Sequence, residues 1–311
     1  QTTPFRMAAL RWTQVSLKEA FDDVLQKYAR SLKPDLLVAQ WNHLGAFNQI
    51  NGDERSALPG TLWGRGEDYL WYSMGNVGSQ TDLANGDLGD GTLQLRYIRG
   101  AFGAKPFLLG KYEQTRTRAS IAEGIANNGA GMGFYAPFKD PAGRDALVSY
   151  FRFTREHRAI YEGARPAAET LLLYPRSAVH AGDVDPVARF RALGKRLVRE
   201  GIAFDVVPDD ILAPENLRDR AVLALTDESA LDADAKKILA TFRGARITHL
   251  TGDNTDSVNL PPQTKSLATR REGGETVVIS TLENASHSQR FIHLVNYNRT
   301  EPPKARDPGT G

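Results

Sequence analysis

The sequence predicts an α/β protein with parallel sheets, and three observations lead to that class. Short apolar runs alternate with amphipathic segments over both halves of the chain, which is typical of βαβ units. Several of the runs are continuously apolar, as in strands buried on both faces. Hydrophobic residues make up 41% and charged residues 24% of the chain, the composition of a soluble globular protein.

The first half contains four strand-and-helix cycles. A helix is expected over 16–31, where Ser16 and Glu19 form a capping box and Pro34 ends it. Strands are then expected at 35–40, 68–73, 105–113 and 131–136, and helices at 92–102, 116–127 and 145–161. These units predict a parallel sheet, but four or five of them are too few to close an eight-stranded barrel. A barrel built from this chain would therefore be only its later part.

The second half predicts a small doubly wound domain over roughly 165–255. Its expected strands are 170–174, 201–207, 221–225 and 245–250, and its expected helices are 186–200 and 232–242. Gly201 stands where a helix C-cap glycine belongs. No glycine-rich phosphate loop follows the first strand, so the expected role of this domain is structural or in oligomerisation.

The last segment changes to β structure. Runs at 276–280 and 291–297 predict a hairpin or the opening strands of a β-sandwich, and the tail 301–311 is rich in proline, glycine and charge. The expected divisions are 1–164 for the barrel portion, 165–256 for the doubly wound domain and 257–311 for an incomplete β segment.

Composition excludes several function classes. The chain has 39 basic and 37 acidic side chains, a net charge of +2, so nothing indicates a nucleic-acid partner. No run approaches the roughly 18 apolar residues of a membrane span. There is no cysteine, which excludes disulfides, thiolate metal sites and a cysteine nucleophile. Because the chain starts at Gln1, as a processed polypeptide would, a secreted or periplasmic location is expected.

Several sequence stretches, together with the order of the predicted domains, resemble those of a known protein family. They are GEDYLWYSMGN, KPFLLGKYEQTRTRASIAEGIANNGA, REHRAIYEGARP, FRALGKRLVREGIAFDVVPDDIL and HLVNYN. The chain resembles the glycoside hydrolases that carry a β-galactosidase-type trimerisation domain behind their barrel, including family 42 and its hydrolase-like relatives. The resemblance implies the C-terminal portion of a TIM-type (β/α)8 barrel followed by a flavodoxin-like domain. It also implies a homo-oligomer. From the number of βα units, the N-terminal strands of the barrel are expected either to be missing from this sequence or to be supplied by a second polypeptide.

Three carboxylates are candidates for catalysis. Glycoside hydrolysis uses two carboxyl groups, and a barrel gathers them at the C-terminal ends of its strands. Glu113 ends the 105–113 strand, although an ion pair with Arg116 or Arg118 is the structural alternative. Glu67 and Asp68 face the site if a strand ends with them, and are structural if the strand starts at Asp68.

Aromatic and polar residues at the strand ends are the expected binding groups, because sugar rings stack on indole and phenol faces. Trp41, Asn42 and His43 emerge together after a buried strand. The other expected contacts are Trp71, Tyr112, Arg116 and Tyr135, although aromatic residues also simply fill cores. The six histidines show no metal-ligand spacing, so neither a metal site nor a cofactor is expected.

These features together predict a hydrolase of glycosidic bonds in a poly- or oligosaccharide, with Glu113 and either Glu67 or Asp68 as its carboxylates. The first alternative is a polysaccharide lyase that uses Tyr112, His43 and Arg116. The second is a non-catalytic carbohydrate-binding or assembly protein with a degenerate barrel, since fold alone does not decide activity.

Overall fold

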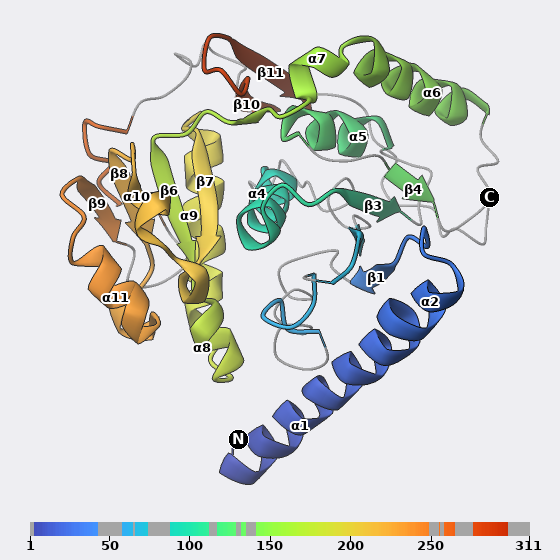
Figure 1. Ribbon diagram of the computed structural model, residues 1–311. Helices are drawn as coiled ribbons and strands as arrows, with labels where there is room; N and C mark the ends of the chain where they lie inside the picture. The colour runs from blue at the N-terminus through green and yellow to red at the C-terminus, as the bar shows by residue number, and fades with distance from the viewer. Residues whose placement is uncertain are drawn as a thin grey trace.

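Three sheets organise the molecule (Figure 1). The computed structural model describes residues 3–42, 58–64, 66–73, 88–111, 117–128, 132–134, 141–248, 255, 258–264 and 276–297. Sheet A has the strand order β1-β2-β3-β4, sheet B has β11-β10-β5, and sheet C has β7-β6-β8-β9. Sheets A and C are parallel throughout, and in the described ranges helices lie between β2, β3 and β4 and between the strands of sheet C, so the predicted α/β class is confirmed.

Sheet A follows the chain in order, each strand beside the next. Its strands are β1 (Ala39–Asn42), β2 (Tyr69–Ser73), β3 (Phe107–Lys111) and β4 (Met132–Phe134). The helices of this half are α4 (Asp90–Phe102), α5 (Thr117–Ala126), α6 (Pro141–Glu156) and α7 (Arg158–Tyr161). The last three expected strands are present with shorter bounds. The first, expected at 35–40, is shifted to Ala39–Asn42, so that Trp41 and Asn42 lie in the strand rather than after it.

The N-terminal helix begins twelve residues earlier than predicted. It comprises α1 (Pro4–Phe21), the π-helical segment η1 (Asp22–Ala29) and α2 (Arg30–Leu32). The start at Ser16 was wrong because Thr3 is the N-cap. Its hydroxyl accepts a hydrogen bond from the Arg6 backbone N–H at 3.3 Å, and Pro4 takes the first helical position.

Apolar residues of this helix that recur at the three-to-four spacing of an amphipathic helix are largely exposed. Leu17, Val24 and Tyr28 face solvent, whereas the side chains that α1 buries are those of Gln14 and Lys18. The i→i+5 hydrogen bonding of η1 widens the helical turn, so a pattern read at 3.6 residues per turn loses its phase there.

Sheet C has the order of a doubly wound fold, because its first strand, β6, lies between β7 and β8. Its strands are β6 (Thr170–Tyr174), β7 (Phe204–Pro208), β8 (Val222–Leu225) and β9 (Ala245–Thr248). Its helices are α8 (Arg176–His180), α9 (Asp185–Arg199), η3 (Asp209–Ile211), α10 (Pro214–Leu217), η4 (Glu228–Ala230) and α11 (Ala233–Leu239). Gly201 has φ +65° just beyond α9, which confirms it as the helix-ending glycine.

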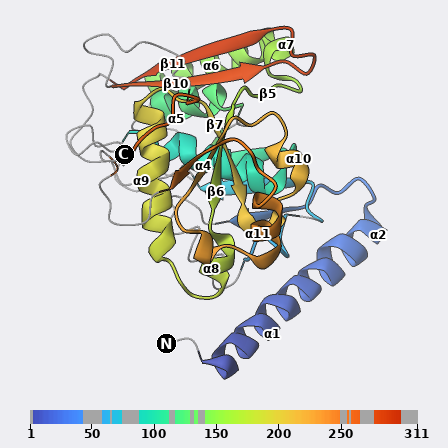
Figure 2. The ribbon, with the colours of Figure 1, turned by 90° about the vertical axis from the view of Figure 1, so that its left-hand side faces the viewer.

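Sheet B is the predicted hairpin with one short strand added. Strands β10 (Val277–Glu283) and β11 (Arg290–Asn296) are antiparallel, and β5 (Arg165–Pro166) pairs with the end of β10. In both views the hairpin lies across one end of sheet C (Figures 1 and 2). The boundaries expected at 164 and 256 stay predictions.

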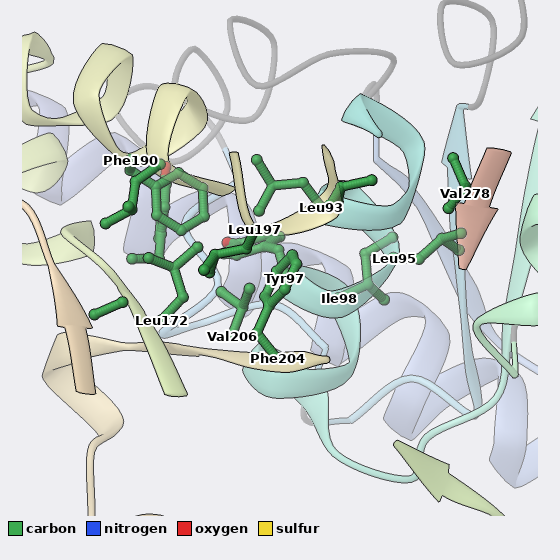
Figure 3. Close-up of a cluster of buried hydrophobic side chains, with 14 of the residues drawn as sticks. Leu93, Leu95, Tyr97, Ile98, Leu172, Phe190, Leu197, Phe204, Val206 and Val278 are labelled. Atoms are coloured by element: carbon green, nitrogen blue, oxygen red, sulfur yellow. The ribbon is translucent and has the colours of Figure 1, made fainter. Parts of the chain in front are cut away.

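Helix α4 is the centre of the core, buried from Gly91 to Ile98. Its side chains point to both sides: Tyr97 lies toward Phe204 and Val206 of sheet C, and Leu95 lies toward Val278 of sheet B (Figure 3). Leu70 and Phe107 of sheet A belong to the same apolar cluster. One continuous core therefore joins all three sheets.

Close approach between α4 and sheet C depends on glycine. A Cβ on Gly100 would lie 1.6 Å from the backbone carbonyl oxygen of Val206 in β7. Across the same interface, a Cβ on Gly194 of α9 would lie 2.6 Å from Leu93 Cδ1. The first contact is with backbone, which has no rotamer to change, so Gly100 fixes how closely helix and strand pack.

We predict that Gly100→Ala destabilises the protein by about 3 kcal/mol, toward the upper end for an overpacked core. The Cβ has no room without moving β7 away from α4. Gly66→Ala is the control, since its Cβ would lie an ordinary 3.4 Å from Gln26 Nε2, and a change below about 0.5 kcal/mol is expected. Urea unfolding followed by circular dichroism measures both, and equal midpoints would contradict the packing described.

Candidate active site

The carboxyl ends of the sheet A strands form one edge, because the four strands are parallel. The strands end there at Asn42, Ser73, Lys111 and Phe134. An amide, a hydroxyl, an ammonium and an aromatic residue therefore stand at neighbouring strand ends. In barrels this edge holds the active site, and it is the candidate site here.

Three predicted binding residues lie in adjacent strands at this edge. Trp41 of β1 is the register partner of Trp71 of β2, and Asn42 is the partner of Tyr72. Neighbouring strands are about 4.8 Å apart, so the two tryptophan backbones are side by side in the sheet. The structure thus brings together two residues that are 30 positions apart in the sequence.

The other predicted residues of this edge lie outside the described residues. They are His43, Tyr112, Glu113, Arg116 and Tyr135. In the sequence, His43 directly follows β1, Tyr135 directly follows β4, and Glu113 stands two positions after the end of β3. Their roles stay predictions.

Glu67 and Asp68 lie at the opposite, amino end of sheet A, because β2 begins at Tyr69. Asp68 Oδ2 accepts hydrogen bonds from the Val38 backbone N–H at 2.6 Å and from Arg30 Nη2 at 2.5 Å. The Asp68 N–H in turn donates to the Val38 carbonyl at 2.8 Å. The strand therefore starts after Glu67 and Asp68, which is the alternative in which the pair is structural. At this amino end of the strands, barrels place groups that stabilise the fold.

The environment of Asp68 favours its charged form. The Val38 N–H hydrogen bond is the main influence that lowers the pKa of this carboxyl below its ordinary value, and Arg30 adds to it. Asp68 therefore ties the segment before β1 and the end of the N-terminal helix to the start of β2.

Glu67 is fully buried beside the same helix. Lys18 Nζ lies 3.8 Å from Glu67 Oε1, and it also lies 5.4 Å from the ring centroid of Trp63. Lys18 pairs in addition with Asp22 on its own helix. A lysine shared by two carboxylates and an aromatic ring holds the helix against the segment that leads into β2.

Several polar atoms of this cluster have no hydrogen-bond partner within the described residues. They are both carboxylate oxygens of Glu67, Trp63 Nε1 and, from η1, Gln26 Nε2. Two acceptors and two donors in a buried setting are the groups that ordered water satisfies. Sequence reasoning did not find Lys18, Gln26 and Trp63 as one cluster, because the π-helical turn that aligns them leaves no periodic signal.

The carboxyl edge of sheet C is filled by its own side chains. Asp209, just after β7, accepts hydrogen bonds from the Ser177 N–H at 3.0 Å and the Asp232 N–H at 2.8 Å. Burial raises the pKa of Asp209, and these two N–H groups partly offset that rise. The buried Arg176 donates to Asp210 at 2.8 Å. These bonds tie three loops together where doubly wound folds elsewhere bind ligands, which favours the predicted structural role.

Within the described ranges, no three acidic, histidine or cysteine side chains come close enough together to hold a metal ion. None of the helices in the same ranges is both long and apolar enough to span a bilayer.

Comparison with known proteins gives partial likenesses of fold. No protein-family profile and no curated protein matches the chain. The match with a β-galactosidase from the psychrophilic Marinomonas ef1 covers 69% of this chain and 39% of the β-galactosidase chain, with a TM-score of 0.49 and 12% sequence identity. The match with an alpha-L-fucosidase isoenzyme 2 from Paenibacillus thiaminolyticus covers 70% of this chain and 33% of the fucosidase chain, with a TM-score of 0.48 and 16% sequence identity.

Each likeness covers well under half of the other protein. The chain spans about two fifths of the length of the β-galactosidase and a third of that of the fucosidase. At this level of similarity the matches assign the chain to no family and to no activity.

We predict that Asp68→Asn lowers stability by roughly 1 kcal/mol at pH 7, because a partly exposed pair contributes little. A carboxyl with a lowered folded-state pKa stabilises the fold above its unfolded pKa of about 3.9, and this contribution disappears as the pH falls through the folded value. The difference in stability between wild type and variant should therefore begin to narrow as the pH falls below about 4. Urea unfolding at pH 7 and pH 3 measures it, and a constant gap would contradict this account.

Proposed function

We propose that the chain is part of a glycoside hydrolase that cleaves a poly- or oligosaccharide at the carboxyl edge of sheet A. One observation carries the proposal: four parallel strands lie side by side in chain order. A doubly wound sheet reverses its strand order, whereas a (β/α) barrel keeps it. The ends of these strands bear Trp41, Asn42 and Lys111, and Glu113 follows in the sequence.

Each residue type has a role in this chemistry. Tryptophans such as Trp41 and Trp71 stack on the flat C–H faces of sugar rings. Amide and guanidinium groups, here Asn42 and Arg116, hydrogen-bond to hydroxyls. Glu113 is the proposed catalytic carboxyl, either as proton donor or as the group that attacks the anomeric carbon. Its pairing with Glu67 or Asp68 stays a prediction, and their place at the amino end of β2 favours a partner from elsewhere.

We also propose that the barrel is completed by a second copy or by another polypeptide. Within the described residues β1 and β4 are the edges of sheet A, and four strands do not close a barrel. The exposed Phe5 and Trp12 on α1 offer apolar surface for such a contact. If a second copy completes it, light scattering after size-exclusion chromatography would give an assembly larger than 34.2 kDa, and a monomer at micromolar concentration would contradict completion by a second copy.

The activity is tested on a panel of polysaccharides, following reducing ends and ultraviolet absorbance together. We expect new reducing ends without absorbance, and a loss of about a thousandfold or more in Glu113→Gln because that variant has no proton to give or take. Asp68→Asn is the matched control, with most of the activity retained since Asp68 lies at the other end of β2.

Three results would change the assignment. Ultraviolet absorbance reports an unsaturated product and would move the function to a lyase that uses Tyr112, His43 and Arg116. Full activity in Glu113→Gln would remove Glu113 from the chemistry. No product on any substrate, with the completed assembly present, would leave a carbohydrate-binding or assembly role.

A further inference from the structure

A charged cleft of about 800 Å³ lies between the hairpin of sheet B and the amino edge of sheet C. One side is formed by Arg165 of β5, Glu283 at the end of β10, and His287 in the turn that follows. The other side is formed by residues between α10 and β8, among them Arg218. No residue of sheet A lines it in the described part of the chain, so this cleft is separate from the candidate active site.

The hairpin side holds more positive than negative charge. Glu283 Oε1 lies 3.0 Å from Arg165 Nε, and Glu283 Oε2 lies 3.8 Å from Arg290 Nε. His287 Nδ1 lies 2.8 Å from the same carboxylate. Two guanidinium groups thus share one carboxylate that is almost buried. The Nη2 of Arg165 also lies 2.9 Å from His287 Nδ1, whereas the side chain of Arg290 is mostly exposed.

The floor of the cleft also has two guanidinium groups around one carboxylate. Asp205 of β7 accepts from Arg220 Nη2 at 2.6 Å, and Arg96 Nη1 of the buried helix α4 lies 3.7 Å from its other oxygen. Again two guanidinium groups share one carboxylate. Within each of these two clusters the guanidinium groups outnumber the carboxylate, and further carboxylates, among them Glu169, also line the cleft.

The rim near α10 carries the opposite charge. Glu215 and Asp219 line it beside Arg218, which makes no ion pair within the described residues. Over the whole lining, four arginines and His287 face five carboxylates. Such a surface suits a ligand that has anionic groups for the arginines and hydroxyl donors for the carboxylates.

No aromatic side chain lines the cleft in the described ranges. A neutral sugar held by ring stacking is therefore a poor fit, and charge-assisted hydrogen bonds have to supply recognition. The volume lies within the roughly 300–1,000 Å³ of small-molecule sites, enough for a short oligosaccharide.

We propose that this cleft binds an acidic oligosaccharide, with the uronate carboxylates on Arg290 and Arg218 and the hydroxyls on Glu215 and Asp219. The carbohydrate class of the ligand rests on the proposed function. The acidic character rests on the cleft alone. The cleft is thus an accessory binding site, which holds an acidic glycan away from the edge where cleavage is proposed.

The test is calorimetric titration of the full chain with trigalacturonate, and with maltotriose as the neutral probe. Trigalacturonate should bind and maltotriose should not at the same concentrations. Arg290→Ala and Arg218→Ala remove exposed guanidinium groups without unpairing a buried carboxylate, and each should weaken binding by about tenfold. Arg158→Ala, an exposed arginine on α7 outside the cleft, should change nothing.

Binding and cleavage are measured separately, so their failures can be told apart. If the protein binds trigalacturonate through Arg290 and Arg218 and yet releases no reducing ends, that result supports the proposed binding site in the cleft and contradicts the proposed hydrolase activity. Hydrolysis without trigalacturonate binding contradicts the cleft. The proposed site in the cleft is also contradicted if both variants bind trigalacturonate like wild type, or if maltotriose binds as well as trigalacturonate.

Discussion

The contact between Gly100 of α4 and the backbone of β7 is the constraint on which the rest of the structure depends. Without a Cβ at that position, a helix of the first half packs directly on a sheet of the second half. Sheets A and C then bury their apolar faces in a shared core. This arrangement differs from two domains joined by a linker, which would each keep a core of their own.

Burial of α4 also determines which polar groups must lie inside. Arg96 is fully buried, and loss of hydration lowers its pKa to about 10, so it stays charged at neutral pH. A buried charge needs partners, and Arg96 has Asp205 at 3.7 Å and Ser280 at 2.8 Å. Because Asp205 also binds Arg220, the core reaches the floor of the charged cleft and contributes to its positive charge. Packing and the proposed ligand chemistry are connected through this one carboxylate.

Local signals predicted much of the fold. The continuous apolar run Thr170–Tyr174 is a strand buried on both faces, and Gly201 ends α9 with a positive φ. The sequence did not predict the π-helical turn, in which Tyr28 is exposed, since it depends on hydrogen bonds that no periodic pattern records. Nor did it predict the cleft, whose Arg165 and Arg290 are 125 positions apart and meet only through the pairing of β5 with β10. For the candidate active site, order along the chain predicted which strand ends are neighbours, as with Trp41 and Trp71.

Hydrogen exchange, resolved by segment in native conditions, tests most directly whether α4 makes the two halves one cooperative unit. The account predicts that the slowest amides of β2 and β3 and those of β6 and β7 open with the same free energy, and lose protection together as urea is added. Protection that persists in β6–β8 after β2 and β3 have exchanged would show two independent cores, and would contradict it.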